Sequence, residues 1–185
     1  MKKMLFLVSI ALFSVIMVNG VQAAITLSLV PVQGSSVLVG NQFDLDLILN
    51  TDTAGLFGGT LSFTFNPALV TFQGLTPGAD IDTAAAYPDS TIDFSTPDFT
   101  NGFAINQDLD IGTLSFLAQD IGTADFALSA ISPWFDINFD EVFASLSFNE
   151  VGTSVSVNAV PIPGSLLLLG SGLISLVGLG RKKRS

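Results

Sequence analysis

The chain has 185 residues, with 16 acidic side chains against six basic ones and with neither histidine nor cysteine. All six lysines and arginines lie near the two ends, so the stretch between them carries a formal side-chain charge of −16. This charge excludes nucleic-acid binding, which depends on Lys and Arg to neutralise phosphates. This stretch also lacks the histidine, cysteine and lysine side chains that nucleophilic triads, Schiff bases and histidine-dependent metal catalysis require. We therefore predict that the protein is not an enzyme.

The N-terminus has the parts of a secretory signal peptide. Lys2 and Lys3 precede an apolar run over residues 4–18, and Ala23 supplies a small residue where a signal peptidase cuts. We predict that residues 1–23 are a signal peptide, cleaved between Ala23 and Ala24. An uncleaved anchor is the alternative, which the shortness of the apolar run disfavours.

Residues 24–158 have the length of one domain with one core. Segments such as Phe43–Leu47 alternate apolar and polar residues, which indicates a strand with one buried face. The predicted strands are Ile25–Val30, Phe43–Leu47, Leu61–Phe65, Leu69–Phe72, Gly102–Ile105, Gly112–Leu117, Ala124–Ala130, Val142–Phe148 and Thr153–Val157. We therefore predict an all-β fold, an antiparallel β-sandwich or jelly roll of about nine strands.

The stretch Thr76–Asn101 is the longest weakly patterned part of this domain and is rich in acids. Calcium prefers oxygen ligands, so a calcium site between loops stays an alternative to the absence of any cofactor. Its candidate ligands are Asp80, Asp82, Asp89, Asp93 and Asp98. The acids of Asp136–Asp140 do not fit an EF-hand loop, because Glu141 stands where that loop needs glycine. Their alternation with apolar residues favours a solvated strand face.

Several segments follow one another in the order of a known family. Val39–Leu45 opens a strand after Val-Gly, and Ala54–Val70 contains a strand, an Asn-Pro turn and then Leu. The segments Gly112–Phe116 and Gly122–Ala124 follow. Over residues 25–157 this order resembles the cohesins, surface modules that capture dockerins in cellulosomes. The resemblance implies a nine-stranded jelly roll and a role in binding a protein partner.

Binding of carbohydrate is the main alternative to binding of protein, because jelly rolls also serve as sugar-binding modules. Exposed Trp and Tyr rings are the usual sugar platforms, and the chain has one of each, Trp134 and Tyr87. Both are candidate sugar contacts. The alternative for Trp134 is a buried position inside the sandwich. The two hypotheses are thus a protein-binding or structural module and a carbohydrate-binding module.

Residues 159–185 have the three parts of a sorting and anchoring tail. A motif kept extended by its prolines comes first, and residues 163–180 then contain no charge. As a helix they would cover roughly 27 Å, enough to cross a bilayer core. The basic end that follows should stay in the cytoplasm and stop transfer. The motif is Val160, Pro161, Ile162 and Pro163, and the basic end is Arg181, Lys182, Lys183 and Arg184.

This motif, the Leu166–Leu169 run and the basic end together resemble the PEP-CTERM sorting signal of Gram-negative surface proteins, which exosortases process. The family usually has Glu where this chain has Ile162. The resemblance implies an exported protein that is anchored in the inner membrane by its transmembrane helix. Processing then delivers it to the cell surface or the extracellular matrix, in association with exopolysaccharide. A permanent single-pass anchor is the alternative.

Overall fold

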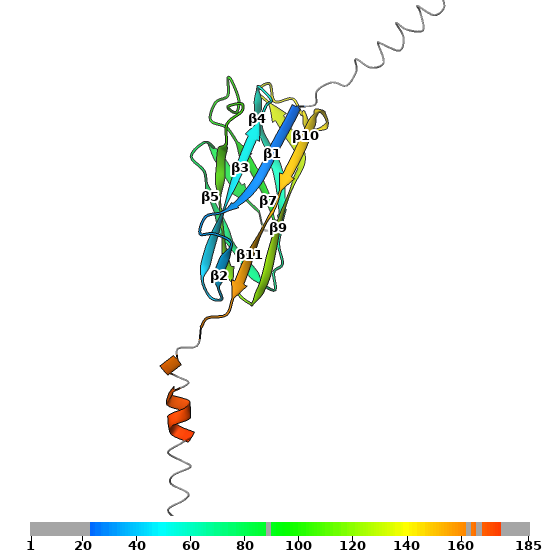
Figure 1. The fold of residues 1–185 in the computed structure, drawn as a ribbon. Helices are drawn as coiled ribbons and strands as arrows, with labels where there is room; N and C mark the ends of the chain where they lie inside the picture. Colours follow the sequence, from blue (N-terminus) through cyan, green and yellow to red (C-terminus); the bar gives the residue numbers. More distant parts are fainter. Residues whose placement is uncertain (1–22, 88–89, 162–163, 166–167, 175–185) are drawn as a thin grey trace, which may run out of the picture.

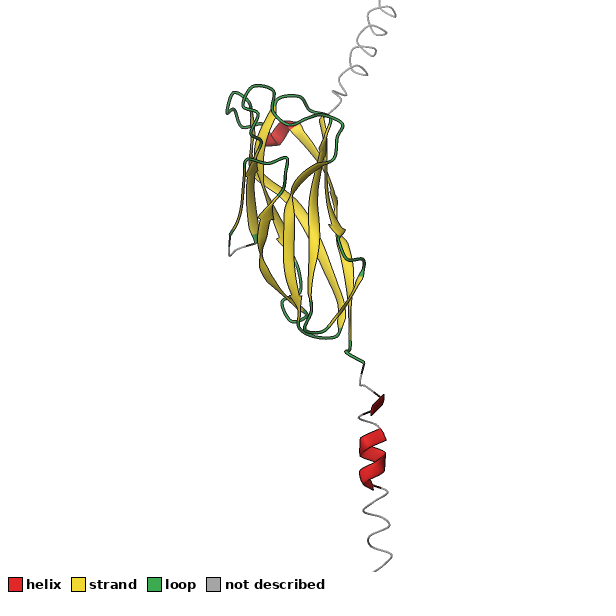
Figure 2. Ribbon diagram, turned by 90° about the vertical axis from the view of Figure 1, so that its left-hand side faces the viewer, coloured by secondary structure: helices red, strands yellow, loops and turns green. Residues whose placement is uncertain are grey.

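The computed structural model describes residues 23–87, 90–161, 164–165 and 168–174. These residues form two β-sheets that pack face to face into an elongated sandwich (Figures 1 and 2). The chain enters the sandwich at Ala23 at one end and leaves it after Asn158 at the other end (Figure 1). Loops gather at both ends, where they connect the strands (Figure 2).

Eleven strands make up the described part of the sandwich. One sheet has the order β10-β1-β3-β8-β5, and its strands are β1 (Ala23–Pro31), β3 (Gln42–Thr51), β5 (Val70–Pro77), β8 (Leu109–Ala118) and β10 (Leu146–Val151). The other has the order β2-β11-β9-β4-β7-β6, and its strands are β2 (Ser36–Leu38), β4 (Leu56–Thr64), β6 (Thr83–Ala86), β7 (Thr91–Ser95), β9 (Gly122–Asp136) and β11 (Thr153–Asn158). Pairing is parallel for β1 with β10 and for β2 with β11, and antiparallel for the other pairs.

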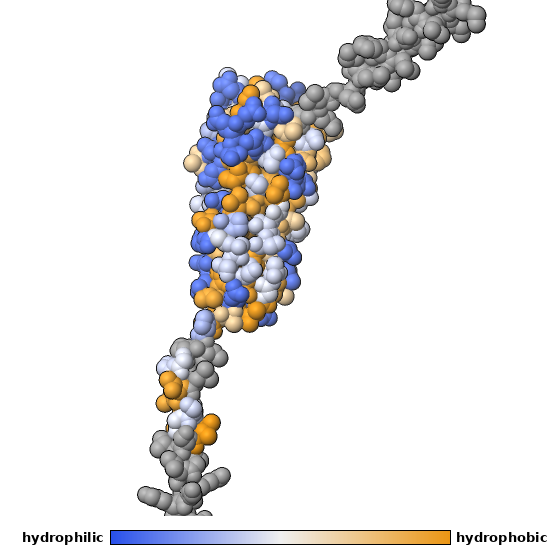
Figure 3. Space-filling view, viewed as in Figure 1, coloured by the Kyte–Doolittle hydropathy of each residue, from blue (hydrophilic) through white to orange (hydrophobic). Residues whose placement is uncertain are grey.

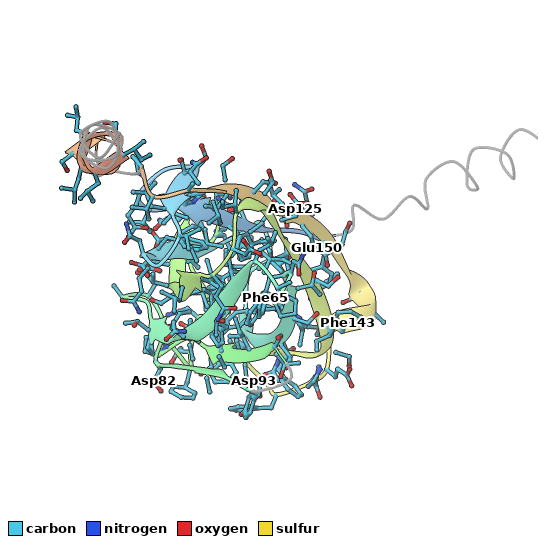
Figure 4. The ribbon with its side chains drawn as sticks, turned by 90° about the horizontal axis from the view of Figure 1, so that it is seen from below. Phe65, Asp82, Asp93, Asp125, Phe143 and Glu150 are labelled. Atoms are coloured by element: carbon cyan, nitrogen blue, oxygen red, sulfur yellow. The ribbon has the colours of Figure 1, made fainter. Side chains whose placement is uncertain are left out.

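Phenylalanine rings fill the space between the sheets. Strand β3 alternates buried and half-buried residues along its length, as a strand with one face on a core should. Phe116 on β8 has no exposed surface and is surrounded by other rings at centroid distances of 4.8–6.3 Å. These rings belong to Phe43, Phe63, Phe65, Phe72 and Phe126. Phe65 lies toward the middle of the molecule when the sandwich is viewed along its length (Figure 4).

The predicted all-β sandwich is confirmed, with four corrections to its strands. The described residues form eleven strands rather than about nine. The predicted strand Gly102–Ile105 is wrong: the segment is a loop, and Gly102 has a φ of +77° that strands do not use. The weakly patterned stretch Thr76–Asn101 contains the paired strands β6 and β7. The predicted strand Val142–Phe148 begins with a 3₁₀ turn, Phe143–Ser145, before β10.

The two ends of the chain fall largely outside the described residues. These include the predicted signal peptide up to residue 22, the motif residues Ile162 and Pro163, and the basic end. In the tail, residues 164–165 and 168–174 are helical. Within the described part of the chain, no helix has the length and apolar character needed to cross a membrane. The transmembrane segment and the sorting signal stay predictions.

Candidate binding face

A hollow of about 230 Å³ opens on the outer face of the six-stranded sheet, where β4 lies between β7 and β9. The register between β4 and β9 shifts on both sides of the pair Gly58 and Gly59, so the sheet is irregular here. The residues around the hollow are Phe57, Gly58, Gly59, Thr60, Asp93, Phe94, Pro133 and Phe135. Asp93 lies on the same side of the sandwich as Asp82 and away from Asp125 in the end view of Figure 4.

Trp134 lies beneath this hollow and belongs to the core. Its side chain has no exposed surface, and its indole N–H donates a hydrogen bond to the carbonyl oxygen of Thr60 at 2.8 Å. The ring packs against Phe94 and Phe148 at centroid distances of 5.4 and 4.9 Å. A Cβ atom on Gly59 would lie 2.3 Å from Cδ2 of this ring, so only glycine allows β4 to pass so close.

The candidate sugar contact at Trp134 is therefore wrong, because a fully buried ring has no face to offer to a sugar. The alternative position, inside the sandwich, is the one observed. Tyr87 follows β6 and is 45% exposed. As a sugar contact it stays a prediction.

Two exposed phenylalanines and a half-buried one lie together beside the hollow. We call Phe57, Phe99 and Phe139 the distal aromatic cluster. The Phe57 ring lies 5.0 Å from that of Phe99 and 5.1 Å from that of Phe139, measured between centroids. Phe99 and Phe139 are 56% and 62% exposed. Large apolar side chains gathered at the surface commonly mark an interaction site.

The cluster lies at the end of the sandwich opposite to the C-terminal tail. Phe57 is next to Leu56, which pairs with Asp136 at the last residue of β9. The tail follows β11, whose Val157 pairs with Gly122 at the first residue of β9. The length of the fifteen-residue strand β9 therefore separates the cluster from the start of the tail.

Phe99 and Phe139 each lie in or next to a turn in which an aspartate carboxylate accepts hydrogen bonds from backbone N–H groups. Asp98, next to Phe99, accepts hydrogen bonds from the backbone N–H groups of Thr100 and Asn101 at 2.9 Å each and from Nδ2 of Asn101 at 3.0 Å. Asp136 accepts from the backbone N–H groups of Asn138 and Asp140 at 2.8 and 3.0 Å. These bonds close two Asx-type turns.

The hydrogen bonds also stabilise the ionised form of both carboxylates. The side-chain amide of Asn101, followed by two backbone N–H groups, lowers the pKa of Asp98 from its ordinary value of 3.8. The backbone N–H of Asp140 lowers the pKa of Asp136 in the same way, against a smaller opposing effect of desolvation. Both groups therefore stay negative in mildly acidic solution.

Phe139 adopts a backbone conformation that bulky side chains rarely use. Its φ is +63°, in the left-handed region. Such residues cost of order 1–3 kcal/mol and persist only where the surroundings hold them. Here the N–H of Phe139 donates to the carbonyl oxygen of Asp136 at 2.9 Å, and the N–H of Asp136 donates to that of Asp140 at 3.0 Å. Strain at an exposed aromatic residue is typical of a functional position.

We expect the two carboxylates to titrate below pH 3.8 in the folded protein. Because folding lowers their pKa, the stability that they contribute is complete above the unfolded value and is lost as the pH falls through the folded value. The measurement is ¹³C NMR of the Asp98 and Asp136 carboxyl carbons during an acid titration. The amide signals of Thr100 and Asp140 should move at the same midpoints. Midpoints at or above 3.8 would contradict the assignment of these turns.

The candidate calcium ligands are not brought together. Asp80 accepts a hydrogen bond from the backbone N–H of Asp110 at 2.9 Å, whereas Asp93 accepts one from the Thr60 hydroxyl at 2.7 Å. Asp98 holds its own turn, and Asp89 lies outside the described residues. Asp82 is exposed after β5. Among the residues that the structure describes, no three or more carboxylates form a group able to hold a metal ion.

Neither a protein-family model nor a curated protein sequence matches this chain. Solved structures do match its fold. A cohesin module from a family 33 glycoside hydrolase of Clostridium perfringens has a TM-score of 0.53 at 13% identity, and the match covers 75% of this chain and 98% of that one. A non-cellulosomal cohesin from the archaeon Archaeoglobus fulgidus has a TM-score of 0.52 at 10% identity, over 74% and 91% of the two chains.

A third match is a chain of the complex between CaDoc0917 and CaCohA2, the latter from Clostridium acetobutylicum. Its TM-score is 0.51 at 11% identity, and the match covers 74% of this chain and 99% of that one. At such low identities the likeness concerns the fold alone. The chain therefore has a cohesin-like β-sandwich fold.

Proposed function

We propose that this chain is an exported, tail-anchored protein-binding or structural module that is displayed at the cell surface or in the extracellular matrix. The observation that carries the proposal is the distal aromatic cluster: two rings, each more than half exposed, stand at the end of the sandwich away from the tail. A module held by its tail would present this end to its surroundings. The match to a chain of the CaDoc0917–CaCohA2 complex supports the proposal, because there a chain of similar fold occurs in a complex between two proteins.

The N-terminal end of the sandwich suits the expected signal cleavage. The backbone nitrogen of Ala24 donates to Oδ1 of Asp52 at 2.8 Å, and the N–H of Asp52 donates to the carbonyl oxygen of Ala24 at 3.2 Å. Cleavage after Ala23 would turn this nitrogen into an ammonium group beside a carboxylate. In a segment without Lys or Arg, that ammonium would be its one fixed positive charge. The pairing supports cleavage at this bond.

The start of the tail is suited to processing. Strand β11 ends at Asn158, and the motif residues Val160 and Pro161 are exposed beyond it. In this proposal the uncharged segment crosses the inner membrane, Arg181–Arg184 remains in the cytoplasm, and an exosortase-type enzyme cuts near the motif. The sandwich is then released or retained at the surface. An association with exopolysaccharide would result from this sorting and not from sugar binding by Trp134.

Deleting Val160–Ser185 is expected to move the protein from the cell envelope to the medium or periplasm, because it removes both the motif and the apolar segment. The measurement is fractionation of the native cells with intact-mass analysis of the protein in each fraction. The wild-type mature chain should begin at Ala24 and end near Pro163. A chain that ends at Ser185 in the inner membrane would indicate a permanent anchor. Unchanged localisation of the deletion variant would refute tail-dependent sorting.

A further inference from the structure

The distal aromatic cluster combines two properties that together define the chemistry of a partner. Two of its rings, Phe99 and Phe139, belong to residues more than half exposed, and each lies close to the half-buried Phe57. The negative face of an aromatic ring attracts cations. The side chains of the domain supply none, because no lysine or arginine occurs between residues 4 and 180. These ring faces have no competing cationic side chain from their own domain.

Acidic residues neighbour the cluster in sequence on both turns, and one more lines the adjacent hollow. Asp98 precedes Phe99 directly, and Asp136 and Asp140 bracket the turn that carries Phe139. Glu141 follows on the same segment, where its carboxylate accepts a hydrogen bond from the Ser132 hydroxyl. Asp93 lines the adjacent hollow. On the face drawn in Figure 3, hydrophilic residues gather toward this end of the sandwich with apolar residues among them.

We propose that the partner at this face is a polypeptide segment that places an arginine or lysine side chain on the distal aromatic cluster. The inference rests on the proposed protein-binding function and specifies the chemistry of its partner. The cation lies over the rings of Phe99 and Phe139 and between the Asp98 and Asp136 carboxylates. An apolar residue of the same segment enters the neighbouring hollow, whose wall includes Phe57 and Phe135.

Charge and geometry both favour a cationic segment over a purely apolar one. With a formal side-chain charge of −16, the domain attracts basic partners and repels acidic ones at low ionic strength. The two carboxylates beside the cluster are held ionised by their own turns and need no rearrangement to receive a cation. The shared ring of Phe57 makes the hollow and the cluster one continuous surface.

The test is NMR titration of the signal-processed full chain in a non-ionic detergent with two capped peptides. One has the sequence Gly-Arg-Leu-Arg-Gly, and the other has citrulline, the neutral isostere, in place of both arginines. The arginine peptide should shift the signals of Phe99, Phe139, Asp98 and Asp136. The citrulline peptide should bind at least about tenfold more weakly, since it lacks the charge that the rings and carboxylates attract.

Variants separate the cation contact from simple burial. Phe99→Leu keeps an apolar surface but removes a ring face, so the preference for arginine over citrulline should fall about fivefold or more. Ile121→Ala and Asp120→Asn serve as matched controls, because both residues are exposed beside Gly122 at the opposite end of β9. Circular dichroism should show that all three variants are folded.

Three results would overturn the proposal: equal binding of both peptides, shifts spread evenly over acidic residues at both ends, or no shift at tens of millimolar peptide. Each of these would leave the proposed export and display of the module intact, since that proposal is tested by fractionation and mass. Conversely, the chain could bind the arginine peptide at this face and yet not be sorted by its tail. That result would refute only the proposed display at the cell surface.

Discussion

Replacing Phe116 with alanine is expected to lower the free energy of unfolding by about 3–5 kcal/mol. The side chain has no exposed surface, and five other phenylalanine rings lie around it at centroid distances of 4.8–6.3 Å. Removing it leaves a cavity that strands of both sheets border, because these rings come from both. Domains of this size are stable by about 5–15 kcal/mol in total, so the loss is a large part of the whole.

The measurement is urea denaturation of the signal-processed chain, followed by far-UV circular dichroism. Phe139→Ala is the matched control, since its ring is 62% exposed and its removal opens no cavity. We expect that control to change the free energy of unfolding by no more than about 1 kcal/mol. A loss below about 1 kcal/mol for Phe116→Ala would show that the rings around it close the cavity or that the core is packed differently.

Much of the sandwich could be predicted from local alternation. In Phe43–Leu47 the apolar residues occupy every second position, and the structure places them all on the core side of β3. Strands β6 and β7 lack this signal in part, because Ala84–Ala86 is weakly apolar and the acid-rich surroundings are typical of a loop. Gly102–Ile105 contains a buried Phe103, but this residue lies in a loop, where its N–H donates to the carbonyl oxygen of Leu56 at 2.8 Å and its ring packs against Phe94.

The candidate binding face could not be predicted as a unit. Phe57, Phe99 and Phe139 are far apart in sequence, and only the closure of the sandwich brings them together. Local signals for the two turns do exist, since Asp98 and Asp136 each precede an Asn within three residues. The alternation over Asp136–Asp140 predicts a solvated strand face, and this prediction is wrong, because β9 ends at Asp136 and a turn follows. Alternation alone does not distinguish a strand from a turn whose aspartate binds its own backbone.

Replacing Trp134 with alanine should also lower the free energy of unfolding by about 3–5 kcal/mol. The ring is fully buried between Phe94 and Phe148, and the Thr60 carbonyl would lose its hydrogen-bond donor. Urea denaturation must be followed by circular dichroism, because the variant has no tryptophan left to fluoresce. Tyr87→Ala is the control: with a half-exposed ring it should cost about 1 kcal/mol or less.

A double-mutant cycle with Gly59 tests the packing directly. Gly59→Ala alone should cost about 1–3 kcal/mol, because its Cβ would lie 2.3 Å from the Trp134 ring. In the Trp134→Ala background that ring is absent, so the same substitution should cost little or stabilise the protein. Additive effects would mean that the glycine is needed for another reason. Strong coupling would mean that the floor of the hollow is set by one contact between a glycine and a tryptophan. The hollow's shape would then depend on the same residue that supports the core below it.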